Sequence, residues 1–278
     1  GQGNFSTGGV RVSGASPAGL ALGDFDKDGD VDAAFAMHHS NEWLVLTNDG
    51  TGSLTVTGSY GLASVEALEA ADFNSDGWID IAATNLNSNR LVFFFNDGQG
   101  DFVQQQDLPS GGSYPSFLRS GDFDGDGDAD TVVVHQSSDS LSIFVNNGSG
   151  VFSPGATYNL GTQGSVAQLT VADWNNDGAS DIVASSLEEN GTSKLFAISP
   201  LTEQIIEHDI ANSSYATAVG DFDGNGRLEV ALSRKAASGN GINGNFLDFY
   251  EFSGPNSFSI PEDSPEQTVN LTGITAGG

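Results

Sequence analysis

Apolar residues along this chain come in short runs, separated by polar segments rich in glycine, aspartate and asparagine. Residues 33–36, 91–95 and 132–134 are examples of such runs. They are too short for helices and show no period of 3.6, whereas apolar runs of this length between turn residues are typical of β-strands. The pattern predicts an all-β protein.

The runs recur in groups of four, and the first group illustrates their order. An apolar run at 20–22 precedes a polar loop, and further runs follow at 33–36 and 44–46. An Asn-Asp-Gly turn at 48–50, of the kind that joins hairpins, leads to a more polar fourth run at 53–57. We expect the first two runs to be buried inner strands and the fourth to be a solvated edge.

The group of four runs repeats with a period near 50 residues, which is the size of a four-stranded propeller blade. Equivalent aspartates stand at positions 24, 72, 122, 173 and 221, so the steps are 48, 50, 51 and 48. We therefore predict one β-propeller domain over residues 1–278, with four-stranded antiparallel blades. The five complete repeats are expected at about 14–62, 63–111, 112–161, 162–211 and 212–265. A parallel β-helix is the structural alternative, but its coils are usually shorter.

The two ends of the chain are out of phase with this repeat. Residues 1–5 match the turn and outer strand at 98–102, and residues 269–274 resemble an innermost strand without its loop. We expect partial blade strands at 1–13 and 266–278. These pieces favour part of a longer ring of six or seven blades, and a five-bladed ring with extra end strands is the competing interpretation.

A nine-residue loop with the pattern Asp-x-Asp/Asn-x-Asp/Asn-Gly-x-x-Asp/Glu separates the first two runs of every repeat. Oxygens at positions 1, 3 and 5 of such a loop converge on one point, Gly at position 6 permits the sharp turn, and position 9 adds a carboxylate. Position 7 offers a backbone carbonyl, which leaves its side chain free to vary. About six or seven oxygen ligands on a flexible loop suit Ca²⁺ better than Mg²⁺. The loops contain no His or Cys, so they fit Zn²⁺ and Cu²⁺ poorly.

The loops thus predict about five Ca²⁺ sites, with ligands at positions 1, 3, 5, 7 and 9 of each loop. In chain order, the candidate ligands are Asp24, Asp26, Asp28, Asp30 and Asp32; Asp72, Asn74, Asp76, Trp78 and Asp80; Asp122, Asp124, Asp126, Asp128 and Asp130; Asp173, Asn175, Asp177, Ala179 and Asp181; and Asp221, Asp223, Asn225, Arg227 and Glu229. The fifth site, which relies on the longer Glu229, is expected to be the weakest. An EF-hand is excluded because position 12 is apolar in every loop and lies in an expected strand.

Acidic residues outnumber basic ones by 37 to 8, and the formal net charge is -29. This charge disfavours a nucleic-acid partner, which requires basic patches. No apolar run approaches the length of about 20 residues that spans a bilayer, so we expect no membrane insertion. Self-repulsion of this size destabilises a compact fold unless cations neutralise it, which agrees with the predicted metal loops.

The segments Gly-Asp-Phe-Asp-Lys-Asp-Gly-Asp at 23–30 and Gly-Asp-Phe-Asp-Gly-Asp-Gly-Asp at 121–128, with the turn at 96–102, resemble the FG-GAP/VCBS repeat family. Repeats of this family form the integrin α-subunit propeller and occur in many bacterial secreted proteins. The resemblance covers nearly the whole chain. It implies a propeller with calcium in loops between adjacent strands and a role in adhesion or ligand binding. Asn225 at position 5 and the lack of a Gly-rich turn at 198–200 depart from the family pattern.

Residues for catalysis or sugar binding give weaker signals. The histidines are His38, His39, His135 and His208, and none belongs to a catalytic motif. We expect structural roles for them, and we expect that the chain is not an enzyme. Trp43, Tyr60, Tyr114 and Tyr158 lie near expected loops or strand ends, where they form either a sugar platform or, as we favour, core packing.

These observations predict a calcium-stabilised extracellular or cell-surface binding and adhesion module without catalysis. Its expected partner is a protein or carbohydrate ligand at a surface, and the oligomeric state is left open. One alternative is a glycan-binding accessory domain of a secreted polysaccharide-degrading enzyme. Another alternative is a structural or filament-forming surface subunit.

Overall fold

Antiparallel pairing of short strands builds every sheet of the computed structural model, which describes residues 16–161, 164–188, 192–210, 214–235, 245–254 and 257–259. Five sheets contain four strands each, and the strands of a sheet are hydrogen-bonded in chain order. The first sheet contains β1 (Pro17–Gly23), β2 (Asp32–Met37), β3 (Glu42–Asn48) and β4 (Leu54–Gly61). The second contains β5 (Val65–Ala71), β6 (Asp80–Asn85), β7 (Arg90–Asn96) and β8 (Phe102–Pro109). The third contains β9 (Pro115–Gly121), β10 (Asp130–His135), β11 (Ser140–Asn146) and β12 (Phe152–Asn159). The fourth contains β13 (Gly164–Ala172), β14 (Asp181–Glu188), β15 (Ser193–Ser199) and β16 (Gln204–Ile210). The fifth contains β17 (Ser214–Gly220), β18 (Glu229–Lys235), β19 (Asn245–Gly254) and β20 (Ser257–Ser259).

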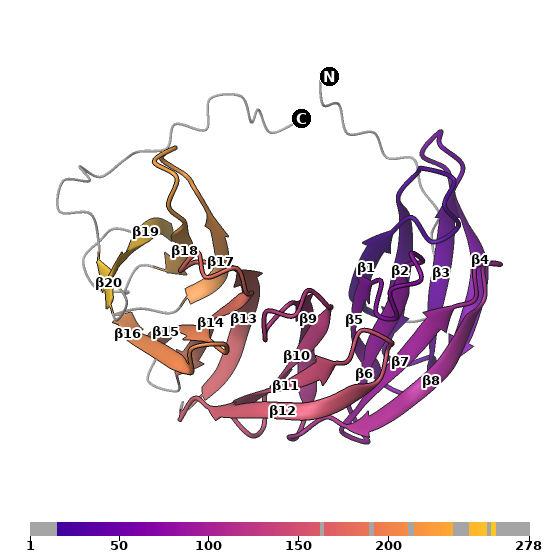
Figure 1. Ribbon diagram of the computed structural model, residues 1–278. Helices are drawn as coiled ribbons and strands as arrows, with labels where there is room; N and C mark the ends of the chain where they lie inside the picture. The colour runs from indigo at the N-terminus through magenta and orange to yellow at the C-terminus, as the bar shows by residue number, and fades with distance from the viewer. Residues whose placement is uncertain are drawn as a thin grey trace, which may run out of the picture.

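The sheets follow one another along an arc, with the first strand of each on the inside and the fourth on the outside (Figure 1). The inner strands touch in sequence, β1 with β5, β5 with β9, β9 with β13 and β13 with β17. This is the arrangement of propeller blades, and it confirms the predicted all-β fold of four-stranded antiparallel blades. A parallel β-helix is excluded because all strand pairs in the described sheets are antiparallel.

The arc is open between the first and fifth sheets over the described residues (Figure 1). The partial strands predicted at 1–13 and 266–278 lie outside the described residues, so the total number of blades stays a prediction. Within the described part of the chain, no helix is both long and apolar enough to cross a lipid bilayer.

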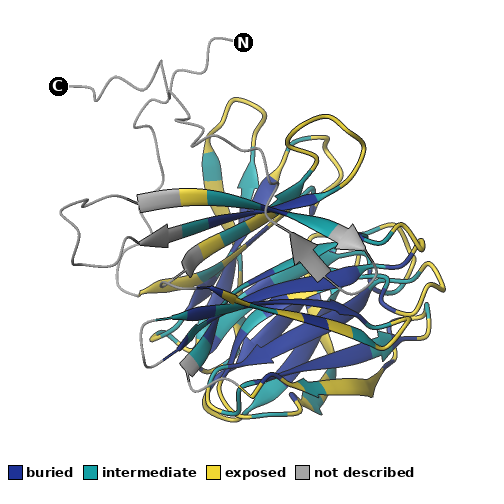
Figure 2. Ribbon diagram, turned by 90° about the vertical axis from the view of Figure 1, so that its left-hand side faces the viewer, coloured by how far each residue is buried: buried dark blue, intermediate teal, exposed yellow. Residues whose placement is uncertain are grey.

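Four of the five clusters of buried apolar residues lie between neighbouring sheets, because a single sheet cannot bury both faces by itself. The fifth cluster, Met37, Leu44 and Leu46, lies within the first sheet. Phe25 at position 2 of the first loop meets Phe102 of β8 edge to face, with ring centroids 5.6 Å apart. Phe73 of the second loop meets Phe152 of β12 in the same way at 5.5 Å. The second strands are buried throughout in β6 and β10, and exposure concentrates in loops and outer strands (Figure 2).

The expectation that the first run of each repeat is buried is wrong for the first sheet. Leu20 and Leu22 of β1 are 53% and 58% exposed. They share a face with Phe35, Ala33 and Leu44 through the strand register. That face points away from the second sheet, whose contact is made by the alternate residues such as Ala21. Period-2 alternation therefore leaves the leucines on the side of the sheet that no described sheet covers.

Candidate metal centres

The five acidic loops connect the first and second strands of the sheets and share one internal hydrogen-bond network. The carboxylate at position 1 accepts a bond from the backbone N–H of the glycine at position 6 in every loop. The donor–acceptor distances are 3.1 Å for Gly29 to Asp24, 2.7 Å for Gly77 to Asp72, 2.9 Å for Gly127 to Asp122, 3.0 Å for Gly178 to Asp173 and 3.0 Å for Gly226 to Asp221. The loop is thus closed on itself around its first aspartate.

Side chains at positions 3 and 5 form the middle of the same network. Oδ1 at position 3 accepts the N–H of position 5, as in Asp124 with Asp126 and in Asn175 with Asp177. Oδ1 at position 5 accepts the N–H of position 7. Asn therefore replaces Asp at positions 3 and 5 without loss of these bonds, since an amide oxygen accepts as a carboxylate oxygen does.

The carboxylate at position 9 is the first residue of the second strand and is buried in every loop. In the second loop, Asp80 Oδ2 accepts the N–H of Phe73 at 3.0 Å and Oδ1 accepts the N–H of Asn96 at 2.8 Å. Asp32 and Asp130 make the equivalent pairs of bonds. One carboxylate thus holds the loop start and the end of the third strand together.

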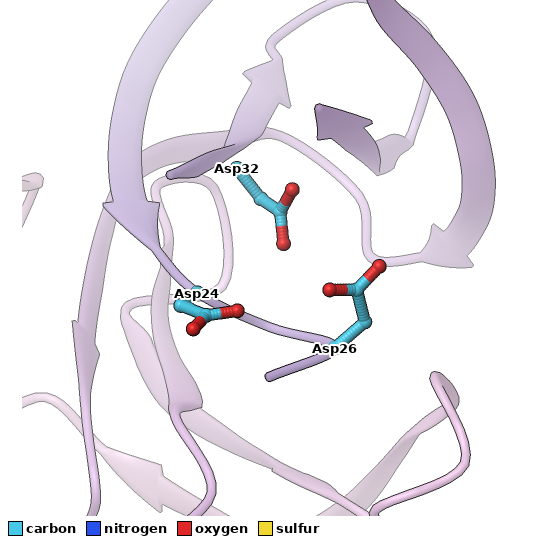
Figure 3. A group of neighbouring side chains, drawn as sticks. All are labelled: Asp24, Asp26 and Asp32. Atoms are coloured by element: carbon cyan, nitrogen blue, oxygen red, sulfur yellow. The ribbon is translucent and has the colours of Figure 1, made fainter. Parts of the chain in front are cut away.

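Positions 1, 3 and 9 bring their carboxylate oxygens to one point in three loops. Ligand atoms lie within 4.8 Å of one another in each group, and Figure 3 shows the first group facing a shared space. These groups can hold a metal ion. They are Asp24, Asp26 and Asp32; Asp122, Asp124 and Asp130; and Asp221, Asp223 and Glu229.

The donor set and its unmet hydrogen-bonding capacity both fit a hard cation. The converging atoms are carboxylate oxygens, which hard divalent cations prefer. Asp24 Oδ1, Asp181 Oδ1 and Glu229 Oε1 are buried without a hydrogen-bond donor among the described residues. A buried carboxylate oxygen without a donor is costly, and a bound cation removes that cost.

The raised pKa values of the buried carboxyl groups in the loops also favour a bound cation. Burial raises the pKa of Asp80 to about 7, and the charges of Asp76 and Asp72 add to the shift against two backbone donors that lower it. Burial likewise raises the pKa of Asp130 and of Asp181 to about 6. A cation among these groups favours their charged forms and opposes the shifts.

Not every predicted ligand joins the converging groups. Asp28 and Asp126 at position 5 lie outside them, since each carboxylate is turned to the N–H of position 7. Loops two and four have Asn74 and Asn175 at position 3, so each presents one carboxylate fewer at that point. The backbone carbonyl ligand predicted at position 7, including that of Trp78, stays a prediction.

Two features of the loops were missed in the sequence. Position 4 has a positive φ in all loops, with Lys27 at 58° and Gly125 at 81° as examples; the only signal was a mixture of Gly, Asn, Ser and Lys there. The asparagine at the end of the third strand was interpreted only as a turn residue. In addition to its place in the turn, Asn96 donates a hydrogen bond of 2.8 Å through Nδ2 to the carbonyl of Phe25 in the preceding sheet.

The histidines and aromatic residues that we considered for chemistry lie mostly in packing positions. His135 is fully buried, and its Nε2 lies 2.7 Å from the carbonyl oxygen of Ser110. Trp43 is fully buried and stacks on Tyr60 with centroids 4.5 Å apart. Tyr114, by contrast, is 45% exposed.

Comparison with protein families finds the family described as FG-GAP-like repeat three times, at residues 24–83, 72–133 and 122–184. Each match begins at the first aspartate of one loop and ends after position 9 of the next loop. No curated protein matches the chain in sequence.

Many solved structures resemble the fold, and two of them serve as examples. The Kuenenia stuttgartiensis hydrazine synthase is 12% identical with a TM-score of 0.61, over 93% of this chain and 69% of that one. A protein from Lactobacillus plantarum is 13% identical with a TM-score of 0.60, over 88% of this chain and 83% of that one. At these identities the likeness concerns the fold alone.

The expectation that the chain is not an enzyme is corrected by the first of these structures. Hydrazine synthase is an enzyme, and a chain of it contains the same arrangement of sheets. The expectation rested on the lack of a catalytic motif in a binding-type repeat fold. Because one fold can serve unrelated functions, a fold of this kind does not exclude catalysis.

Proposed function

The chain belongs to the family of FG-GAP-like repeats, and on that premise we propose that it is a calcium-stabilised binding or adhesion module that works outside the cell or at its surface. The observation that carries the proposal is the convergence of carboxylates at positions 1, 3 and 9. It recurs at the same place in the first, third and fifth sheets, which supports a common structural role for the loops.

Calcium is the cation that the loops support best. The loops offer only oxygen ligands, and some positions hold Asn where others hold Asp. Such a variable set of oxygen ligands suits Ca²⁺ better than Mg²⁺. Extracellular calcium modules bind with dissociation constants of about 10⁻⁴–10⁻³ M. Loops of that affinity fill where calcium is millimolar, and this supports a location outside the cell.

Bound calcium would stabilise the sheets by two routes. It would join the end of the first strand, through position 1, to the start of the second strand, through position 9. It would also relieve the repulsion between carboxylates within a loop. In the first loop, for example, burial and the charges of Asp32, Asp28 and Asp24 raise the pKa of Asp26. Ligand binding would then fall to less regular surfaces between or beside the loops, with a protein or a carbohydrate as partner.

The test is thermal unfolding of the purified chain as CaCl₂ is added to metal-free protein. We expect a rise in Tm that saturates at millimolar Ca²⁺ and is much smaller with Mg²⁺ at equal ionic strength. Equal effects of the two salts would contradict the proposal, because they would indicate general screening of the charge of -29.

A matched pair of variants locates the effect. Asp122→Asn removes one charge at position 1 and keeps one oxygen acceptor, either for the bond from Gly127 or for the bonds from Gly125 and Asp126. Asp209→Asn removes the same charge at a side chain that is 87% exposed on β16. We expect only Asp122→Asn to reduce the amount of bound calcium and the calcium-induced rise in Tm. Equal behaviour of both variants would count against the loops as the binding sites.

A further inference from the structure

A cavity of about 320 Å³ lies where the fourth and fifth sheets meet, beside their acidic loops. Its walls include Trp174, Asn176, Gln204, Arg227 and Phe252. The volume lies at the lower end of the range of about 300–1,000 Å³ for small-molecule sites, and the mixture of aromatic walls with a few polar groups is typical of such sites. Neither the repeat family nor the proposed calcium loops assigns a role to this cavity.

Arg227 is the cation of the cavity, and its guanidinium makes no ion pair among the described residues. Its backbone N–H donates a hydrogen bond to Asn225 Oδ1 within the loop, whereas its side chain is exposed. In a chain with 37 acidic and 8 basic residues, an unpaired arginine is unusual. The other cationic side chains that the structure describes all have partners: Lys27 over Trp78, Arg90 with Asp107, Arg119 with Glu69 and Lys194 with Glu207.

Trp174 provides an aromatic wall of the cavity. Its ring is 6% exposed and stacks on Phe252 with centroids 4.7 Å apart and an angle of 13° between planes. The indole Nε1–H is buried without an acceptor among the described residues. The other four loops have phenylalanine at this position, so packing between sheets does not require the indole nitrogen. The N–H is too deeply buried for a ligand to reach, so Trp174 contributes only its ring to the cavity wall.

We infer that the cavity binds a carboxylated sugar of the hexuronic acid class. Arg227 pairs with the carboxylate, because a guanidinium matches its two oxygens. Trp174 and Phe252 offer apolar surface to the sugar ring. The amides on the wall suit hydroxyl groups, since both offer donors and acceptors. A cavity with room for about one ring favours a sugar over an acidic peptide, which would need an extended groove.

This inference rests on the proposed function, because the cavity lies between two acidic loops. Asp173, Asp177, Asp221 and Asp223 lie in these loops, and without a cation their charges repel an anion within a Debye length of about 8 Å. Calcium in the fourth and fifth loops would offset these charges and order the loop that contains Arg227. Sugar binding is therefore expected to require calcium.

The experiment is a calorimetric titration of the full chain in millimolar CaCl₂ with sodium glucuronate and, as a matched probe, with neutral glucose. We expect saturable binding of glucuronate, no measurable binding of glucose and loss of the glucuronate signal after chelation of calcium. Equal binding of the two sugars would overturn the role of the carboxylate. Equal binding of a glutamate peptide would overturn the choice of a sugar.

Three variants test the residues. Arg227→Gln leaves the calcium loop intact in our account, since position 7 accepts any side chain, and it should weaken glucuronate binding about tenfold or more. Trp174→Phe introduces the residue of the other loops and keeps an aromatic wall, so it should change binding little. Arg90→Gln removes the same charge from the second sheet and should bind as the unmodified chain does. Unchanged binding in Arg227→Gln would overturn the inference.

Thermal unfolding with and without calcium, measured on the same samples, separates the two proposals. If calcium raises Tm and glucuronate does not bind, the cavity inference fails and the proposed function stands. If calcium has no effect on Tm while glucuronate binds through Arg227, the calcium proposal fails and the cavity inference holds without its calcium requirement.

Discussion

The side-chain amide of Asn96 donates a hydrogen bond of 2.8 Å to the backbone carbonyl of Phe25, which precedes it by 71 residues and belongs to the neighbouring sheet. The next sheet repeats the relationship, with Asn146 donating to the carbonyl of Phe73 at 2.7 Å. In both cases the acceptor is at position 2 of an acidic loop. The asparagine therefore connects the metal loop of one sheet to the hairpin of the next.

Replacing Asn96 should loosen the junction between the first two sheets. Asn96→Ala leaves the buried carbonyl of Phe25 without this donor, and we expect a loss of about 1–3 kcal/mol in the free energy of unfolding. Asn48→Ala is the matched control. Asn48 holds the same repeat position and likewise accepts bonds from its own turn, but its Nδ2 donates to Val31 of its own sheet and not to a neighbouring sheet. Urea unfolding of both variants checks the prediction, and equal losses would contradict it.

The aromatic residue at position 2 should matter only where a following sheet covers it. Phe73 is fully buried, whereas the equivalent Phe222 in the fifth loop is 50% exposed. We expect Phe73→Ala to lower the free energy of unfolding by about 3–5 kcal/mol. We expect Phe222→Ala to change it by less than about 1 kcal/mol. The two free energies of unfolding are compared by denaturant titration. A large loss for Phe222→Ala would indicate that this side chain is covered in solution.

Calcium binding should release protons near neutral pH. The pKa of Asp80 is raised to about 7, so at pH 6.5 this carboxyl is mostly protonated in the metal-free protein. Because its pKa is higher in the folded chain than the ordinary value of 3.8, the metal-free protein should lose stability as pH rises from about 4 through 7. Calorimetry at pH 6.5 in two buffers with different ionisation enthalpies measures the released protons. Release that is unchanged in Asp80→Asn would contradict the assignment.

His135 should have the opposite effect on stability. Burial lowers the pKa of His135 below 6.5, so the folded chain holds the neutral ring and the unfolded chain binds the proton more readily. The stability that the neutral ring contributes is present above pH 6.5 and is lost as pH falls through the lowered pKa. We expect the difference in unfolding free energy between the natural chain and His135→Gln to shrink as pH falls from 7 to 5. A constant difference would contradict this prediction.

Local chemistry accounts for the features that were predictable before the structure. The spacing of Asp, Asn and Gly in the loops, such as Asp24 to Asp32, determines which backbone groups the side chains reach, and the hydrogen bonds follow from it. The alternation of apolar residues in runs such as 132–134 likewise determines strand formation. The orientation of the side chain at position 5 was harder to predict. The Asp28 carboxylate can face either the converging point or a nearby backbone N–H, and the exact loop geometry decides between the two.

The amino-acid sequence by itself determined the repeat, the four strands in each unit and the loops with their acidic positions, since all of these depend on contacts between residues close along the chain. Only the tertiary structure decided which faces are covered. Leu20 and Phe222 belong to the same repeat pattern as buried equivalents, yet they are exposed because the described part of the arc has no neighbouring sheet there. The cavity that contains Arg227 also exists only through the meeting of the fourth and fifth sheets. Burial depends on neighbours far away in the chain, and no local pattern encodes them.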